Sequence, residues 1–127
     1  MSSITTTTDR DQNLTQYTVE GRLAIEELAI HIREHNASEL PNVLWDFRNG
    51  EVPPLTTAEA DEVVQKVNQY VVPVEGRRVA LVTRKQLDFG LLRIWNALSE
   101  IASGIEHRVF YEYQDALDWF GLSSDTS

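Results

Sequence analysis

The sequence contains no cysteine among its 127 residues, which excludes both a disulfide framework and catalysis by a thiolate. It also contains no apolar run near the roughly 20 residues that a helix needs to cross a bilayer. The first residues, Met1 to Thr8, are rich in serine and threonine and lack the apolar block of a secretion signal. These absences favour a soluble, cytoplasmic protein.

Positive charge is scarce as well. The chain has 11 lysine and arginine residues against 20 aspartate and glutamate residues, which gives a formal net charge of −9. Because such a surface repels phosphates, this balance argues against general nucleic-acid binding. Hydrophobic residues make up 42% of the chain, which is enough to bury a core. We predict a single domain over residues 3–121 and a flexible tail over residues 122–127.

Signatures of catalysis and of metal binding are incomplete. His31 and His35 have the i, i+4 spacing that can hold a metal, but no glutamate directly follows the first histidine as it does in zinc proteases. The triplet Asp88-Phe89-Gly90 is that of protein kinases, yet the chain has neither their glycine-rich loop nor their catalytic-loop motif. No Gly-x-Ser-x-Gly segment is present. We therefore predict no catalytic residue, no metal and no cofactor, so that an enzyme has no support in the sequence.

Five segments have the composition and alternation of β-strands. In the second, Leu14, Gln16 and Thr18 share one face, and turn-like residues separate it from the first, which predicts a hairpin. The fourth, "RVALVT", is apolar on both faces, as a central strand would be. "RNGEVPP", Arg48 to Pro54, is predicted to be a loop, because glycine and two prolines interrupt regular structure. The predicted strands are Ile4–Asp9, Leu14–Glu20, Val43–Phe47, Arg78–Thr83 and His107–Tyr111.

Four segments have helical signals. The second begins where Thr56 and Glu59 form a capping box, and it ends before Pro73. The predicted helices are Ala24–Asn36, the segment from Thr56 toward Pro73, Leu87–Ser103 and Gln114–Phe120. The order is β-β-α-β-α-β-α-β-α. Alternation of strands and helices predicts an α/β fold with a mixed five-stranded sheet, largely parallel with one antiparallel hairpin.

The chain resembles the SpoIIAA-like family, which shares the fold of STAS domains and is also described as CRAL-TRIO-like. The segments that carry the resemblance are "VEGRLAIEEL" (Val19–Leu28), "VLWDFRN" (Val43–Asn49), "RVALVT" (Arg78–Thr83), "DFGLLRIWNAL" (Asp88–Leu98) and "VFYEYQDALDWF" (Val109–Phe120). The resemblance implies a mixed sheet of about five strands wound as a β-α superhelix. It implies a binding or regulatory module rather than an enzyme.

One motif departs from the pattern of the STAS proteins that antagonise anti-sigma factors. Those proteins carry Asp-Ser-Ser/Thr-Gly at the start of the second helix, where a serine or threonine is phosphorylated. Here the same place reads Leu55-Thr56-Thr57-Ala58, which keeps the hydroxyls without the flanking aspartate and glycine. Two interpretations are open. Thr56 or Thr57 is a phosphorylation site, where the helix dipole would favour the added negative charge. Alternatively, Thr56 is simply the N-cap of the helix.

The carboxyl edge of the sheet is the predicted binding site, because ligands of parallel sheets bind beyond the carboxyl ends of strands and beside helix N-termini. Arg48 follows one strand, Arg84 and Lys85 follow the next, and Thr56 and Thr57 start a helix. These positive side chains either hold a phosphate or carboxylate or balance neighbouring acids.

The helix predicted at Leu87–Ser103 adds two candidates. Phe89 and Arg93 fall on the side away from its apolar face, where an aromatic residue suits a pocket or a partner surface. Two functions follow. The first is a non-catalytic module that engages a protein partner at the carboxyl edge. The alternative is a protein that binds a lipid or an anionic amphiphile. Its apolar part would contact Phe89, Leu92, Trp95 and Trp45, and its head group would contact Arg84 or Arg93. The strand at Ile4–Asp9 also suits a homodimer.

Overall fold

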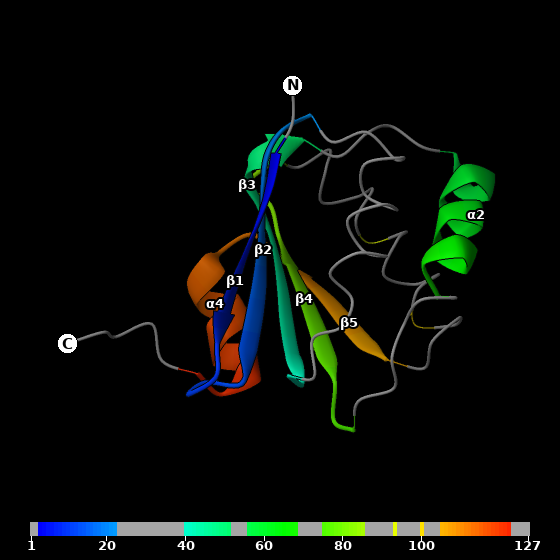
Figure 1. The fold of residues 1–127 in the computed structure, drawn as a ribbon. Helices are drawn as coiled ribbons and strands as arrows, with labels where there is room; N and C mark the ends of the chain where they lie inside the picture. The colour runs from blue at the N-terminus through cyan, green and yellow to red at the C-terminus, as the bar shows by residue number, and fades with distance from the viewer. Residues whose placement is uncertain are drawn as a thin grey trace.

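The structure is a computed structural model that describes residues 3–22, 40–51, 56–68, 75–85, 93, 100 and 105–122. Five strands and two helices lie within these residues, as drawn in Figure 1. They are β1 (Ser3–Asp9), β2 (Leu14–Arg22), β3 (Asn42–Glu51), α2 (Thr57–Asn68), β4 (Arg78–Val82), β5 (Glu106–Phe110) and α4 (Tyr113–Phe120). No helix in this part of the chain is long and apolar enough to cross a membrane.

The five strands form one mixed sheet in the order β1-β2-β3-β4-β5. The hairpin of β1 and β2 is antiparallel, and β2 through β5 run parallel to one another. All five predicted strands are therefore confirmed, as is the largely parallel sheet with one antiparallel pair. Because β3, β4 and β5 are parallel neighbours, their carboxyl ends lie at one edge of the sheet.

The turn of the hairpin is held by local hydrogen bonds. The carboxylate of Asp9 accepts bonds from the backbone N–H groups of Asp11 and Gln12, at 3.1 and 3.3 Å. Asn13 has a positive φ of 55°, a conformation that asparagine tolerates better than most residues. The polar stretch before Leu14 therefore forms a turn, as its composition predicts.

The prediction of a loop from Arg48 onward is wrong for its first four residues, because β3 continues to Glu51. The β2–β3 register moves from Thr18↔Asp46 to Glu20↔Asn49, so β3 carries one extra residue, a β-bulge, in this interval. Gly50 then lies directly against β2. A Cβ atom added to Gly50 would stand 2.8 Å from the carbonyl oxygen of Val19. The glycine allows this close approach and does not interrupt the strand.

Apolar side chains fill both faces of the sheet. On the face away from α4, one buried cluster consists of Tyr17, Val19, Val43, Phe47, Val79 and Leu81. On the face toward α4, the other consists of Leu14, Leu44, Ala80, Val82, Ala116, Leu117 and Phe120. Alternate residues of β3 and β4 thus supply opposite faces, and burial on both sides explains why the "RVALVT" segment lacks an apolar-polar alternation.

The helix α4 confirms the prediction for residues 114–120, with its start one residue earlier. It ends at Gly121, whose φ is 78° and whose N–H donates to the carbonyl of Asp118. Arg78 of β4 donates to the carbonyls of Trp119 and Phe120 at 2.8 and 3.1 Å. These bonds place a positive charge at the carboxyl end of the helix dipole and tie α4 to the sheet.

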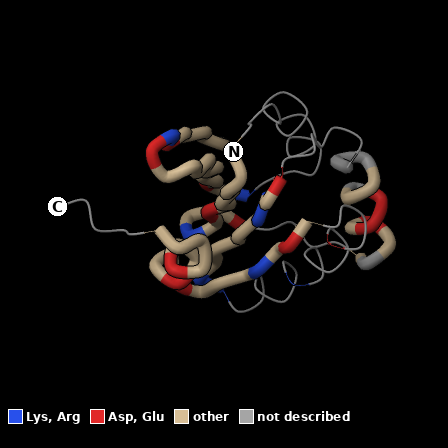
Figure 2. The backbone as a smooth tube through the Cα atoms, turned by 90° about the horizontal axis from the view of Figure 1, so that it is seen from below, with Lys and Arg blue, Asp and Glu red and all other residues tan. Residues whose placement is uncertain are grey.

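Two of the four predicted helices are described. The segment Ala24–Asn36 lies outside the described residues. Of Leu87–Ser103 only Arg93 and Glu100 are described, and both are helical. In Figure 1, α2 stands on the opposite side of the sheet from α4. Viewed from below, acidic positions lie on α2, and both signs of charge occur around the sheet (Figure 2).

Candidate functional site

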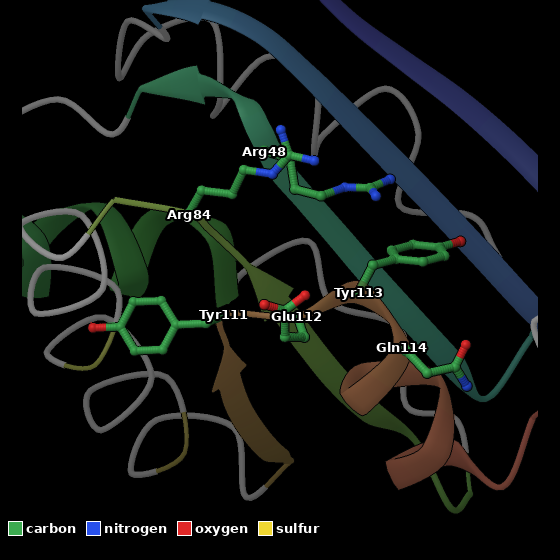
Figure 3. Close-up of a pocket in the computed structure, with 6 residues that line it drawn as sticks. All are labelled: Arg48, Arg84, Tyr111, Glu112, Tyr113 and Gln114. Atoms are coloured by element: carbon green, nitrogen blue, oxygen red, sulfur yellow. The ribbon is translucent and has the colours of Figure 1, made fainter.

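An open pocket of about 720 Å³ lies at the carboxyl edge of the sheet. The described residues that line it come from three neighbouring strand ends and from the start of α4, as Figure 3 shows. They are Arg48, Arg84, Tyr111, Glu112, Tyr113 and Gln114. The structure thus brings together Arg48 and Arg84, two of the residues predicted for a site at this edge.

Arg48 is anchored in the pocket by Asp46. Its Nε and Nη2 atoms each donate to one carboxylate oxygen of Asp46 at 2.9 Å, and its backbone N–H donates to the same carboxylate at 3.0 Å. Only 4% of Asp46 is exposed, so the carboxylate depends on these bonds. The side-chain hydrogen bond to Asp46 raises the pKa of Arg48 above its ordinary value. Arg48 is therefore a permanent cation in a fixed position.

Tyr113 supports Arg48 from the side of α4. The guanidinium carbon of Arg48 lies 4.3 Å from the centre of the Tyr113 ring, a cation–π contact. The Tyr113 hydroxyl donates to the amide oxygen of Gln16 at 2.7 Å, so the contact reaches β2. Burial raises the pKa of the Tyr113 hydroxyl, and the positive charge of Arg48 partly opposes that rise. The phenol stays protonated and keeps its hydrogen bond.

Arg84, Tyr111 and Glu112 are exposed in the pocket, as is Gln114. Tyr111 is 44% exposed, the one large hydrophobic residue of the described chain that stands out in this way. Its ring points to the far side of the pocket from Tyr113, and the carboxylate of Glu112 lies between the two tyrosines (Figure 3). Glu112 precedes α4 as its N-cap but makes no capping hydrogen bond with its side chain. The pocket therefore presents both signs of charge beside an exposed aromatic ring.

Lys85 lies at the same edge but is engaged elsewhere. Its Nζ atom donates to Glu51 at 2.9 Å, and both side chains are about half exposed. An ion pair this exposed contributes little to stability, since water and salt screen it. For Lys85 the structure agrees with the interpretation that a loop cation balances a nearby acid.

The start of α2 has the predicted capping box. The Thr56 hydroxyl accepts a bond from the N–H of Glu59, and the Glu59 carboxylate accepts one from the N–H of Thr56, both at 3.1 Å. The hydrogen bond from the Thr56 N–H lowers the pKa of Glu59. Thr56 is not among the described residues that line the pocket. The side chain of Thr57 lies outside the described residues.

The predicted site on the third helix is only partly described. Arg93 is exposed, and Phe89 lies outside the described residues. Trp45, which the lipid-binding hypothesis uses as a contact, stacks on Tyr17 with ring centres 4.4 Å apart and packs against the buried cluster. Trp45 is therefore part of the core packing on the face away from α4.

Four of the residues that line the pocket were not predicted from the sequence: Tyr111, Glu112, Tyr113 and Gln114. The signal was available, because the rule that places Arg48 and Arg84 at the carboxyl edge applies equally to the residues after β5. Within the described part of the chain, no three histidine, aspartate or glutamate side chains are grouped so that they could hold a metal ion. The site combines the anchored cation of Arg48 and the exposed cation of Arg84 with a carboxylate and two tyrosine rings, groups that can recognise a polar partner.

Solved structures that share this fold include the following two. An anti-sigma factor antagonist from Mycobacterium paratuberculosis matches with a TM-score of 0.60 and 12% identity, over 95% of each chain. An uncharacterized protein with a SpoIIAA-like fold from Shewanella loihica matches with a TM-score of 0.55 and 17% identity, over 94% of this chain and 93% of that chain. This chain has a SpoIIAA-like fold.

The structural likeness covers nearly the whole length of the present chain, and it agrees with the resemblance to the SpoIIAA-like family seen in the sequence. At 12% and 17% identity it establishes the fold and not the function. No protein-family model matches the sequence, and no curated protein matches it.

Proposed function

We propose that this SpoIIAA-like chain is a non-catalytic, cytoplasmic regulatory module that engages a protein partner at the carboxyl edge of its sheet. The observation that carries the proposal is the convergence of three strand ends on one open pocket, where Arg84, Tyr111 and Glu112 are exposed. Arginine and tyrosine are the residue types that dominate binding energy at protein interfaces. The fold supports the same function, because one protein that shares it is an anti-sigma factor antagonist.

The composition of the pocket favours a polar partner surface over an acyl chain. Of its six described lining residues, four are charged or carry an amide, and the two tyrosines each have a hydroxyl. A site for a lipid tail needs a mainly apolar lining. Trp45 belongs to the core packing and is not one of the described residues of the pocket. These observations support the protein partner rather than the lipid or amphiphile.

The start of α2 belongs to the same proposal. We expect Thr56 and Thr57 to contribute a second contact, or a phosphorylation site, beside the helix N-terminus. Phosphorylation of Thr56 would esterify the oxygen that now accepts a bond from the backbone N–H of Glu59, and it would bring a phosphate close to the Glu59 carboxylate that caps the Thr56 N–H. It would therefore exchange the capping box for a phosphate at the positive end of the helix dipole.

Site-specific photocrosslinking tests the proposal. The crosslinking amino acid p-benzoylphenylalanine replaces exposed Tyr111 in one variant and exposed Asp11, in the hairpin turn at the opposite edge, in a matched control. Illumination of cells should give a discrete protein adduct from position 111 alone. Excess wild-type chain should compete that adduct away, and excess Arg84→Glu chain should not. The same adducts from both positions, or none from position 111, would contradict the proposal.

A further inference from the structure

Arg48 differs from an ordinary surface arginine because its position is set before any ligand arrives. Two side-chain bonds to Asp46 and the ring of Tyr113 hold the guanidinium, and the bond from Tyr113 to Gln16 holds the ring. A cation held in this way loses little side-chain entropy on binding. The pair with Asp46 uses Nε and Nη2, so the Nη1 donors take no part in it.

Arg84 brings a second guanidinium to the same pocket from the neighbouring strand end. Its side chain extends from the end of β4 toward the strand that carries Arg48 (Figure 3). Asp46, which is buried, balances the charge of the partly exposed Arg48 in an ion pair. The exposed Arg84 has Glu112 as the one acidic residue in the described lining. An anion between the two arginines would be attracted by both and would compete with Glu112 for Arg84.

We propose that the pocket binds an oxyanion, a carboxylate or phosphate, between Arg84 and the Nη1 edge of Arg48. This rests on the proposed function and names the chemistry by which the partner is recognised. The pocket volume of about 720 Å³ is that of sites which hold whole small molecules, so a lone oxyanion fills only part of it. The group is therefore presented by a larger molecule, whose remaining atoms pack against Tyr111. Glu112 acts as a competing acceptor that sets the affinity.

Titration with small probes tests the inference by NMR. Inorganic phosphate and acetate are added separately to the full chain at constant ionic strength, while the Arg Nε–H signals and the backbone amides are followed. Binding at the exposed site is expected at millimolar concentrations of probe, because solvent screens it. Saturable shifts should appear at Arg48 Nε–H and at the amides of residues 111–114.

Three variants test whether the shifts arise from an anion bound between the two arginines. Arg84→Gln should weaken binding about two- to fivefold, and Glu112→Gln should strengthen it by a similar factor, as expected for exposed charge pairs. Arg10→Gln, which removes an exposed arginine from the opposite edge, is the matched control and should change nothing. Absent shifts at Arg48, or shifts that Arg84→Gln leaves unaltered, would overturn the inference. Crosslinks from position 111 without an oxyanion response would leave the proposed function standing and refute this recognition chemistry.

Discussion

The guanidinium of Arg48 lies 4.3 Å from the centre of the Tyr113 ring, and this contact joins the bulged end of β3 to the first residue of α4. The hydrogen-bond partners of Arg48 and Tyr113 link this contact to the rest of the sheet. Asp46 fixes Arg48 from within β3, and Gln16 of β2 fixes the Tyr113 hydroxyl. The wall of the pocket is therefore part of the folded framework, and its stability can be measured without knowing the partner.

The Tyr113 contacts lead to a prediction for unfolding. Tyr113→Phe keeps the ring and removes the hydrogen bond to Gln16, which should lower the free energy of unfolding by about 1 kcal/mol. In a double-mutant cycle with Arg48→Met and Tyr113→Leu, the coupling energy should be about 0.5–1 kcal/mol, as for exposed cation–π pairs. Urea denaturation measures each variant. Additive losses in the cycle would show that the contact between the guanidinium and the ring stabilises nothing.

Most of the sheet could be predicted from the sequence, because its signals are local. Alternation marks β2, and a run that is apolar on both faces marks β4. The extent of β3 could not be predicted in this way. From the sequence alone, Gly50 indicates the end of a strand. Its role becomes clear only from its contact with Val19 on the neighbouring strand, about 30 residues earlier in the chain. A long-range contact gives that glycine its role.

Two of the six described residues that line the pocket, Arg48 and Arg84, were predicted, and the other four were missed for a related reason. Arg48 and Arg84 follow from the rule on strand ends, since each stands out as a cation beside an apolar run. Tyr113 has no comparable sequence signal, because an aromatic residue at the start of a short amphipathic helix is expected to pack in the core. Its role depends on Gln16, which is 97 positions away in the chain. Asp46 likewise appears in the sequence only as a polar residue within an apolar strand.

The capping box at α2 leads to a second prediction. Thr56→Ala removes the oxygen that accepts the Glu59 N–H bond and should cost about 1 kcal/mol of stability, whereas Thr56→Ser should keep most of it. Glu59 adds a pH dependence. Its folded pKa is lowered, so its contribution is present above the pKa of the unfolded chain and is lost as pH falls through the folded value. Thermal unfolding of both variants measures the effect. Equal stability of Thr56→Ala and wild type would leave the hydroxyl free for another role.

His107 leads to a prediction at mildly acidic pH. Burial lowers its pKa below 6.5, although a bond of 2.7 Å to the carbonyl of Ile105 and the charge of Glu100 partly oppose the shift. Between the folded pKa and 6.5, the unfolded chain binds a proton that the folded chain does not. This group therefore makes the protein less stable as pH falls through that interval.

The variant His107→Asn isolates this effect, because an amide can still donate to the carbonyl of Ile105 but cannot take up a proton. The difference in unfolding free energy between wild type and variant should shift in favour of the variant as pH is lowered from 7.5 to 5. Comparing the two chains cancels the carboxylates and the other histidines, which titrate in both. Denaturant titrations at each pH measure the difference. Two parallel pH profiles would show that His107 titrates alike in the folded and unfolded states.

The last prediction concerns β1, which ends the sheet and pairs with β2 as its one strand neighbour among the described residues. Its residues Ile4 to Thr8 include no charge and no proline, the features by which edge strands usually avoid a second strand. A homodimer would pair β1 with itself about a two-fold axis. With Thr6 at the centre, Thr5 stands opposite Thr7 of the partner subunit, and such threonine pairs are favourable.

Charge at these two positions tests the dimer. Light scattering after gel filtration should give the wild type twice the 14.5 kDa mass of one chain. Thr5→Lys with Thr7→Lys sets like charges opposite each other across the axis and should give a monomer, as should Thr5→Glu with Thr7→Glu. Mixing these two double variants should restore a dimer, because each lysine then meets a glutamate. A wild type that stays monomeric, or a lysine variant that stays dimeric, would place the contact away from β1.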